Sequence, residues 1–526
     1  MGTSPDNYPT YVHRALELFA EYGERDALIR RDRRLSYADL RQAVLDLAAV
    51  LREHGTGSGS AVLILVARPF EAPVLQLALH LIGARSVWID LGALRRDLPE
   101  YVRLTRPEVL VYDARTHDEL GRELAAKLDL PALCLGSGGL GPDLLAPRAT
   151  PAEYDFGPAA GEPSSIFQTS GTTGVPKLIH HTQSFYRQVV VLAEELVASG
   201  ERGVRHLSVS GLTYLAGQVS ALLYLFSGGV LYLLETFDAD EFLDTIERER
   251  INSTFVAPPM LYAVLDHPKL VTTDTSSLTL FSVGAAPALL PRLRQAIARF
   301  GPVLRITYGL SECPFIAANP GLTDDPARPD LLRSCGRPYG DVRVEIRGED
   351  GTAVSNREVG ELWVASAQNF AGYWGQPELT ARTLVDGWLR THDLGYRDAE
   401  GYLYLVGRNQ DMIIAGSVGV KIYPRPIEDV LATHPRVRMA AVVGAPDEDF
   451  GEAAHAYVVT APGAEVTAGE LADLVRTELA DWWVPAAFHF VDSLPLTPTG
   501  KIDSAALRDR PRCLPGRAAQ GASASE

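Results

Sequence analysis

Apolar and polar positions follow two different periods along the first third of the chain. Short apolar runs at residues 61–67 (AVLILVA), 86–90 (SVWID) and 107–113 (PEVLVYD) have the length of buried strands. Between them, residues 35–55 (LSYADLRQAVLDLAAVLREHG) and 74–84 (VLQLALHLIGA) place apolar side chains at helical spacing. Strands that alternate with helices predict a parallel sheet covered by helices, and therefore an α/β fold.

Two local patterns refine this prediction. Ser36 precedes the first helical segment and lies three residues before Asp39, so we expect it to be an N-cap, a feature that contributes about 1 kcal/mol. The most apolar run, residues 219–234, is too short to span a bilayer and is interrupted by Gly228 and Gly229. We expect that run to be buried core.

Length and composition narrow the class of protein. A chain of 526 residues exceeds the usual size of one compact domain, so we expect two or more domains. With 46% hydrophobic and 22% charged residues the chain is globular, and a formal net charge of -17 argues against nucleic acid as a partner. A local pocket can still hold ATP against that overall charge.

The cysteines and the N-terminus indicate a cytoplasmic protein. The N-terminal residues show no secretory signal pattern, and Asp6 disrupts the pattern for myristoylation. The cysteines lie far apart with no CxxC pair, which disfavours disulfides and a structural zinc site. They are Cys134, Cys313, Cys335 and Cys513.

Residues 165–182 (SIFQTSGTTGVPKLIHHT) have the composition of a phosphate-binding loop between a strand and a helical pattern. Glycines let the backbone turn its N–H groups inward, hydroxyls add donors, and Lys177 adds a positive charge. The loop is not of the G-x-x-x-x-G-K-[ST] type, because Pro176 precedes the lysine and Leu178 follows it. Composition alone favours a solvated turn, which remains the alternative.

The stretch TSGTTGVPK resembles the phosphate loop of the acyl-adenylate-forming (ANL) superfamily, which contains acyl-CoA synthetases, nonribosomal-peptide adenylation domains, luciferases and stand-alone amide bond synthetases. Further motifs follow in the superfamily's order, from about Tyr8 to Arg508. They are LSYADL (35–40), GAAP (284–287), YGLSE (308–312), GYW (372–374), GWLRTHDLGY (387–396), GRNQD (407–411) and PLTPTGK (495–501).

The resemblance implies an ATP-dependent acid ligase. Such an enzyme makes a carboxylate attack the α-phosphate of ATP, which gives acyl-AMP and pyrophosphate, and then transfers the acyl group to a thiol of coenzyme A or a carrier protein. Negative charge gathers around one phosphorus in the first step. Cationic groups, N–H donors and Mg²⁺ are needed where that charge develops.

The superfamily pattern assigns these roles by position. Lys177, Glu312 and Lys501 would be catalytic, with Glu312 as the Mg²⁺ ligand and Lys501 bonded to the acyl carboxylate and the α-phosphate. Tyr308 should stack on adenine, and Asp393 and Arg408 should bind the ribose hydroxyls. The other expected ATP-binding residues are Thr169, Ser170, Gly171, Thr172, Thr173, Gly174, Gly284, Ala285, Ala286, Pro287, Gly309 and Ser311.

The acid is predicted from a shorter segment. Tyr214, Leu215, Ala216 and Gly217 align with the superfamily's acyl-pocket motif, and the aspartate that holds the ammonium of an α-amino acid is missing there. An ammonium buried without a partner costs several kcal/mol. We therefore expect an apolar or aryl carboxylic acid without an α-amino group.

The resemblance also implies a domain organisation. Residues 1–406 would form a large αβ body, with parallel sheets, covering helices and a small β-barrel region. Residues 407–411 would be a hinge, with Gln410 where aspartate or lysine is usual, and residues 412–510 a small mobile α+β lid. The composition of the last residues indicates that 511–526 are a disordered tail.

The acceptor of the acyl group is left open by the sequence. Residues 411–424 form a segment about two residues longer than is usual in coenzyme A ligases, and Pro426 replaces the usual glutamate. No carrier domain is expected after Lys501. The candidate acceptors are coenzyme A, the thiol of a separate carrier protein, and a free amine. A non-catalytic nucleotide sensor is the alternative of another class, although the catalytic residues are present.

Overall fold

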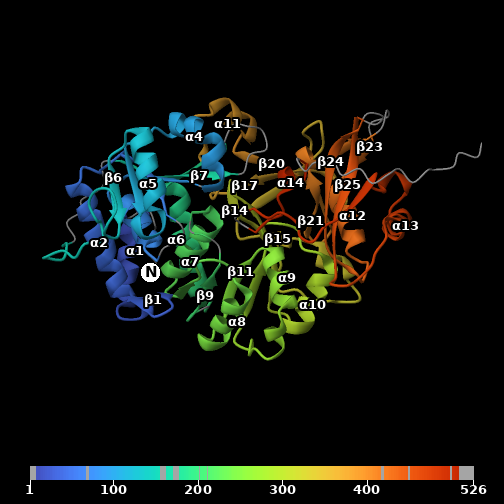
Figure 1. Ribbon diagram of the computed structural model, residues 1–526, viewed down its shortest axis with the longest axis horizontal. Coiled ribbons are helices and arrows are strands. Elements are labelled where there is room, and N and C mark those ends of the chain that lie inside the picture. Colours follow the sequence, from blue (N-terminus) through green and yellow to red (C-terminus); the bar gives the residue numbers. More distant parts are fainter. Residues whose placement is uncertain are drawn as a thin grey trace, which may run out of the picture. The chain divides into compact units, whose positions relative to one another are not determined.

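The computed structural model describes residues 8–66, 70–89, 91–153, 161–169, 177–200, 202–209, 211, 213–415, 420–447, 451–497 and 500–508 (Figure 1). The chain divides into two compact units. The first comprises Met1–Gln410 and Pro498–Lys501, and the second comprises Asp411–Thr497 and Ile502–Glu526. The division after Gln410 falls within residues 407–411. That these residues act as a hinge stays a prediction.

One sheet of the first unit has the order β18-β8-β7-β4-β3-β5-β6. Its five parallel strands are β3 (Ala61–Leu65), β4 (Arg85–Trp88), β5 (Val109–Asp113), β6 (Ala132–Leu135) and β7 (Ser164–Thr169). Strand β8 (Lys177–Thr182) is antiparallel to β7 and to β18 (Gly372–Tyr373). The intervening helices are α3 (Ala72–Leu81), α4 (Leu91–Thr105) and α5 (Ala114–Leu128). This arrangement confirms the α/β fold predicted from the alternating pattern.

The second sheet has the order β15-β14-β13-β12-β11-β9-β10-β1-β2. Six of its strands are parallel neighbours: β13 (Leu304–Leu310), β12 (Leu280–Val283), β11 (Ser253–Val256), β9 (Arg205–Ser208), β10 (Val230–Leu233) and β1 (Asp26–Arg30). The antiparallel edges are β2 (Arg33–Ser36), β14 (Cys313–Ala318) and β15 (Arg337–Pro338). The other helices of the first unit include α1 (Tyr11–Tyr22), α2 (Tyr37–Glu53), α6 (Gln183–Ala198), α7 (Leu215–Phe226), α8 (Ala239–Arg248), α9 (Pro258–Asp266) and α10 (Leu290–Phe300).

Both local predictions from the sequence are confirmed. The Ser36 hydroxyl accepts the Asp39 backbone N–H at 3.0 Å and the Asp39 carboxylate accepts the Ser36 N–H at 3.1 Å, which is a complete capping box at the start of α2. The apolar run 219–234 continues α7, turns at Gly228 and enters β10, and most of it is buried.

A third, antiparallel sheet of the first unit contains the strands that carry the later motifs. It consists of β16 (Arg343–Arg347), β17 (Gly360–Ala365), β20 (Trp388–Arg397), β19 (Leu384–Val385) and β21 (Leu403–Arg408), preceded by the short helix α11 (Pro377–Thr383). The resemblance implies a small β-barrel region in the body without giving its residues, and that it corresponds to this sheet stays a prediction.

The second unit is an α+β structure, as predicted. A three-stranded sheet of β24 (Val437–Asp447), β25 (Gly451–Thr460) and β26 (Ala487–Phe490) packs with α12 (Pro424–Leu431) and α13 (Ala468–Glu478) around an apolar core. Strands β22 (Ile413–Ala415) and β23 (Val420–Ile422) pair with each other, and α14 (Ser504–Arg508) ends the described part. Among the described residues, no helix is long and apolar enough to cross a membrane.

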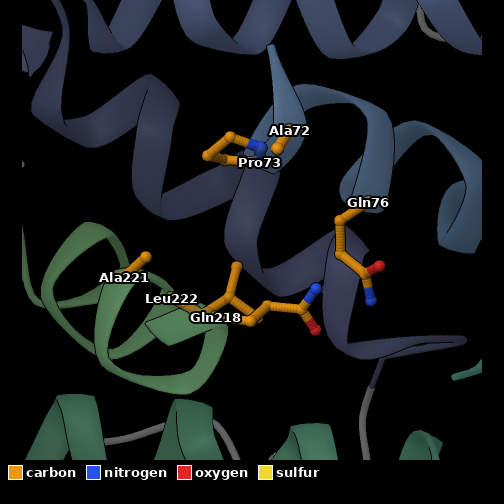
Figure 2. Close-up of a pocket in the computed structure, with 6 residues that line it drawn as sticks. All are labelled: Ala72, Pro73, Gln76, Gln218, Ala221 and Leu222. Carbon is orange, nitrogen blue, oxygen red and sulfur yellow. The ribbon is translucent and has the colours of Figure 1, made fainter. Parts of the chain in front are cut away.

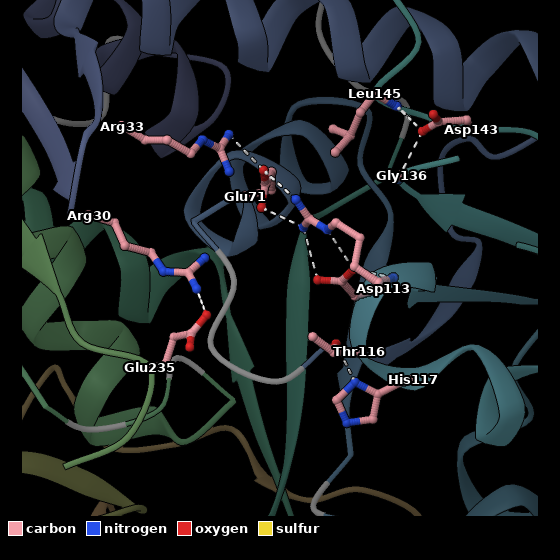
Figure 3. Close-up of polar contacts among 11 residues, drawn as sticks. Arg30, Arg33, Glu71, Asp113, Thr116, His117, Gly136, Asp143, Leu145 and Glu235 are labelled. Carbon is pink, nitrogen blue, oxygen red and sulfur yellow. Dashed lines mark hydrogen bonds and ion pairs between the residues drawn. The ribbon is translucent and has the colours of Figure 1, made fainter. Parts of the chain in front are cut away.

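Two buried carboxylates and two exposed arginines form a charge network that connects elements of the first unit (Figure 3). The Glu71 carboxylate, which is 7% exposed, accepts from Arg33 of β2 at 2.9 Å and from Arg115 of α5 at 3.0 Å. Arg115 also pairs with Asp113 at the end of β5, at 2.9 Å. Because removal of one partner would leave a buried charge uncompensated, this network anchors the β1–β2 hairpin to the seven-stranded sheet.

A small cavity lies between α3 and α7 (Figure 2). Its volume of about 10 Å³ has room for about one water molecule, so it is too small to bind an acid substrate. It is lined by Ala72, Pro73, Gln76, Gln218, Ala221 and Leu222.

Candidate active site

The carboxyl ends of parallel strands in the nine-stranded sheet bring three predicted motifs to one edge. In open α/β sheets, ligands bind at this edge. The predicted acyl-pocket segment follows β9, with Tyr214 at the N-cap of α7. GAAP follows β12, and Tyr308 lies near the end of β13. The topology therefore supports a common site for these motifs.

The acyl-pocket segment is neutral and mostly shielded. Leu215 and Gly217 are buried, Tyr214 is partly buried and Ala216 is exposed. Of the GAAP residues, Gly284 is buried, Ala286 is partly buried, and Ala285 and Pro287 are exposed. No charged side chain lies at any of these positions.

The YGLSE motif lies where β13 turns into β14. Gly309 is needed here, because a Cβ at this position would clash with the carbonyl group of Pro314. Ser311 and Glu312 form the turn between the two strands. The backbone of this turn is held from two sides, since the Ser311 carbonyl lies 2.8 Å from His181 Nε2 and the Glu312 carbonyl accepts the Phe370 N–H at 2.8 Å.

The Glu312 side chain has a partner that the sequence analysis did not assign. The Tyr373 hydroxyl donates to Glu312 Oε1 at 2.8 Å, and burial together with the Glu312 charge raises the pKa of Tyr373, so the hydroxyl stays protonated. Tyr373 belongs to the GYW motif and lies on β18, which pairs with β8. Lys177, the first residue of β8, places its Nζ 5.9 Å from the centre of the Tyr373 ring. Lys177, Glu312 and Tyr373 are therefore brought together.

A second cluster contains the predicted nucleotide-binding residues. The Tyr308 hydroxyl donates to Asp393 Oδ2 at 2.6 Å, and Arg408 Nε donates to Asp393 Oδ1 at 2.9 Å. Asp393 on β20 and Arg408 on β21 are paired directly across the two strands. Asp393 is buried, and so is Tyr308, whose pKa is raised by burial and by the Asp393 charge. Adenine stacking by Tyr308 and ribose binding by Asp393 and Arg408 stay predictions.

The phosphate loop leads into a strand rather than directly into a helix, which corrects the sequence prediction. Thr169 and Lys177 are paired across β7 and β8, and α6 begins only at Gln183. The segment KLIHHT shows no clear alternation, because the neighbouring residues Leu178 and Ile179 face opposite sides of the sheet and are both buried. Among the predicted loop residues, the Thr169 side chain and all of Ser170, Gly171, Thr172, Thr173 and Gly174 lie outside the described residues.

The last two predicted residues lie near the boundary between the compact units. Lys501 is counted with the first unit, and Gln410 is exposed in a short 3-10 turn, Asn409–Asp411. The surrounding protein and the Arg408 charge lower the pKa of Lys501, whereas Glu312 and Asp393 act in the opposite direction.

The donor set fits a magnesium ion that arrives with a nucleotide. In the part of the chain that the structure describes, no group of three or more His, Cys, Asp and Glu side chains could hold a metal ion. Glu312 therefore belongs to no such group among the described residues. Magnesium is usually bound in proteins by one or two carboxylates together with the phosphates of the substrate.

Both parts of the chain match known protein families. Residues 16–374 match the family model of AMP-binding enzymes, and residues 426–501 match that of the AMP-binding enzyme C-terminal domain. The structure is similar to that of the amide bond synthetase McbA from Marinactinospora thermotolerans, with a TM-score of 0.84 and 37% identity over 95% of this chain and 99% of that one.

Two curated relatives use other acceptors, according to their names. A medium/long-chain-fatty-acid–CoA ligase of Mycobacterium tuberculosis is 39% identical over 351 residues, which are 65% of this chain and 60% of that protein. A fatty acid–[acyl-carrier-protein] ligase of Streptomyces coeruleorubidus is 32% identical over 78% of this chain and 81% of that protein.

The motif order, the mixed α/β fold and the two family matches agree. They support an enzyme over the nucleotide sensor that the sequence left open, and AMP-binding enzymes use ATP. The chain belongs to the AMP-binding enzyme family of the acyl-adenylate-forming (ANL) superfamily, and it is an acyl-adenylate-forming ligase.

Proposed function

We propose that the protein activates an apolar or aryl carboxylic acid as acyl-AMP and transfers the acyl group to an amine. The observation that carries the choice of acceptor is the 37% identity with an amide bond synthetase over 95% of this chain. The fatty-acid–CoA ligase is 39% identical over only 65% of the chain, and a feruloyl-CoA synthase of Amycolatopsis, which matches 90% of the chain, is 32% identical. The higher identity at nearly full coverage makes amide formation, the alternative to thiol transfer, our first choice.

The lid segment 411–430 supports this choice. Strands β22 and β23 pair as a hairpin, and Pro426 lies in the first turn of α12, where the missing N–H costs no helical hydrogen bond. The path from Asp411 to Pro424 is about two residues longer than is usual in coenzyme A ligases, and Pro426 replaces their usual glutamate.

The proposal for the acid rests on the neutral segment Tyr214–Gly217. An α-ammonium buried there would lose its hydration without gaining a carboxylate partner, and a penalty of about 3 kcal/mol already means more than a hundredfold in selectivity. The Tyr214 ring offers a flat face for an aromatic acid, worth about 1 kcal/mol. We expect benzoate-like acids to be better substrates than fatty acids, and α-amino acids to be rejected.

In the proposed first step, an oxygen of the acid attacks the α-phosphorus of ATP, the bond to the β-phosphate breaks, and pyrophosphate leaves. Lys177 neutralises charge on the β- and γ-phosphates, and Lys501 bonds the acid and the α-phosphate. Asp393 and Arg408 hold the ribose. A magnesium ion on Glu312 supplies charge neutralisation to the phosphate oxygens when it is bound.

In the proposed second step, the amine nitrogen attacks the acyl carbon, the bond from that carbon to the AMP oxygen breaks, and the nitrogen loses a proton to form the amide. ATP is consumed only in the activation of the acid. The same acyl-AMP could therefore react with a thiol. Thiol transfer is the second candidate, because both fatty-acid ligases among the relatives carry it in their names.

A competition experiment tests the acceptor. The purified protein receives ATP, Mg²⁺ and an aryl acid together with an aryl-ethylamine, coenzyme A and a phosphopantetheinylated carrier protein in one mixture, and products are identified by mass spectrometry. We expect the amide to dominate. Predominant formation of either thioester would show that the corresponding thiol, and not the amine, is the acceptor.

A further inference from the structure

Strand β20 contains an irregularity directly before the predicted ribose-binding aspartate. On β17, Glu361 pairs with Leu394 and Trp363 pairs with Arg390 of β20. Three β20 residues, Thr391 to Asp393, therefore lie opposite the single residue Leu362. Such a bulge interrupts the ladder and turns a side chain in a new direction, and bulges are common next to active sites.

A side chain replaces the missing ladder bonds in this bulge. The Thr391 hydroxyl donates to the Leu362 carbonyl at 2.8 Å and accepts the Asp393 N–H at 3.1 Å. Asp393 then projects to Tyr308 and Arg408, which bond its two carboxylate oxygens. The direction of the Asp393 side chain thus depends on the shape of the bulge.

The central residue of the bulge has a disfavoured backbone conformation. His392 has a φ of 60°, in the left-handed region where a Cβ is crowded and which non-glycine residues seldom occupy. A residue persists there when its surroundings hold it in place.

Glu361 provides that hold. Its Oε1 accepts the His392 backbone N–H at 3.2 Å and lies 3.1 Å from His392 Nδ1, and its Oε2 accepts Arg390 at 2.8 Å. The Glu361 side chain is 10% exposed, and although burial acts to raise the pKa of Glu361, the bonds from His392 and Arg390 lower it to about 2. Glu361 is therefore charged at neutral pH and contacts both the backbone N–H and the ring of His392.

We propose that Glu361 and His392 are positioning residues for the nucleotide: the Glu361 carboxylate holds His392 in the left-handed conformation, and the resulting bulge presents Asp393 to the ribose. This inference rests on the proposed function, in which Asp393 binds the ribose. Neither residue needs to touch the nucleotide. Loss of the contacts between Glu361 and His392 would let the bulge relax. Nucleotide binding would then weaken although Asp393 is still present.

The test measures the affinity of the full chain for AMP by calorimetry, with the thermal midpoint of unfolding recorded for every variant. Glu361→Gln keeps the shape but loses the charge, and we expect AMP binding to weaken about tenfold, as for other residues that orient a ligand-binding group. In steady state, KM for ATP should rise with little change in kcat, because the interaction is made in ground and transition states alike.

The conservative variant at the second residue provides a rescue. Asparagine tolerates the left-handed conformation and its amide can donate to Glu361, so His392→Asn should stay within about threefold of the wild-type affinity. Leucine has a similar size but no donor, so His392→Leu should bind AMP about tenfold more weakly. Equal affinity of the two variants would contradict the inference.

Two further variants separate positioning from general stability. Glu71→Gln removes the charge from another buried glutamate bonded to two basic side chains, and it should lower the thermal midpoint while AMP affinity is retained. If Glu361 acts through Asp393, the double variant Glu361→Gln/Asp393→Ala should bind AMP no more weakly than Asp393→Ala alone.

The outcomes distinguish the two levels of the proposal. Wild-type AMP affinity in Asp393→Ala would refute the ribose assignment in the proposed function, and the inference with it. Weakened binding in Asp393→Ala combined with wild-type binding in folded Glu361→Gln would refute the positioning role only. Additive losses in the double variant would also refute it.

Discussion

At the scale of single residues, the proposed chemistry depends on carboxylates that other side chains hold in place. Glu312 is bonded by Tyr373, and Asp393 is bonded by Tyr308 and Arg408. Each bond fixes the direction of a group for which the proposed chemistry assigns a charge. Orientation of this kind lowers the cost of arranging charges at the moment of reaction.

The charge on Glu312 is expected to determine the magnesium requirement. Glu312→Gln keeps the side-chain shape and the Tyr373 contact but removes the negative charge. Adenylation should fall at least about tenfold at limiting Mg²⁺ and recover in part at high Mg²⁺. Rates of pyrophosphate release across a magnesium titration measure this effect, and an unchanged rate at limiting Mg²⁺ would show that another group holds the ion.

Lys501 is expected to serve only the first half-reaction. Lys501→Ala should lower adenylation by at least about a hundredfold, because the ammonium meets charge that develops between the acid and the α-phosphate. Transfer from chemically prepared acyl-AMP to the acceptor should change little. The two half-reactions are measured separately, and equal losses in both would contradict this role.

The sequence did not predict contacts that depend on which strands pair. Lys177, Glu312 and Asp393 stand in motifs, so their roles could be predicted without a structure. The contacts of Tyr373 and Glu361 could not, because each bonds a residue distant in sequence: Tyr373 bonds Glu312, and Glu361 bonds His392. GYW was noted as a motif, but only the pairing of β18 with β8 shows what its tyrosine contacts.

At the scale of elements, the features predicted best from the sequence were those formed by residues close together in the chain. The capping box at the start of α2 was predictable because its two residues lie three positions apart. Strand β8 was not, since its neighbours β7 and β18 determine its conformation and the second of these lies almost two hundred residues away.

The capping box should contribute stability without affecting catalysis. Ser36→Ala removes the acceptor of the Asp39 N–H and should lower the free energy of unfolding by about 1 kcal/mol. Urea unfolding measures the loss, and Ser36→Thr serves as a control that keeps the hydroxyl. A change in KM for ATP with either variant would show that α2 influences the active site.

The second unit contains a carboxyl group that makes its stability depend on pH. Burial raises the pKa of Glu428 on α12 to about 7, against the opposing effects of the Val442 N–H and Arg425. Between the unfolded and folded pKa values the folded state holds a proton that the unfolded state has lost, so stability decreases as pH rises through this window.

Glu428→Gln should remove this dependence. Urea unfolding between about pH 5 and about pH 8 should show a loss of stability in the wild type that is smaller in the variant. Parallel pH profiles of the two proteins would mean that Glu428 titrates alike in the folded and unfolded states.

At the scale of the whole molecule, two family models and two compact units agree on a body and a smaller C-terminal part. The fold class and the enzyme class could both be predicted from the sequence, because the motifs occur in order along nearly the whole chain. The acid and the acceptor could not, since a few neutral pocket residues are compatible with many acids.

Exchange of labelled pyrophosphate into ATP tests whether this protein forms acyl-AMP from an acid without an α-amino group. This exchange requires reversible adenylation and no acceptor. We predict exchange that depends on an added aryl or apolar acid, that α-amino acids do not support, and that Lys501→Ala abolishes. Exchange supported best by an α-amino acid, or unaffected by Lys501→Ala, would contradict the proposed activity.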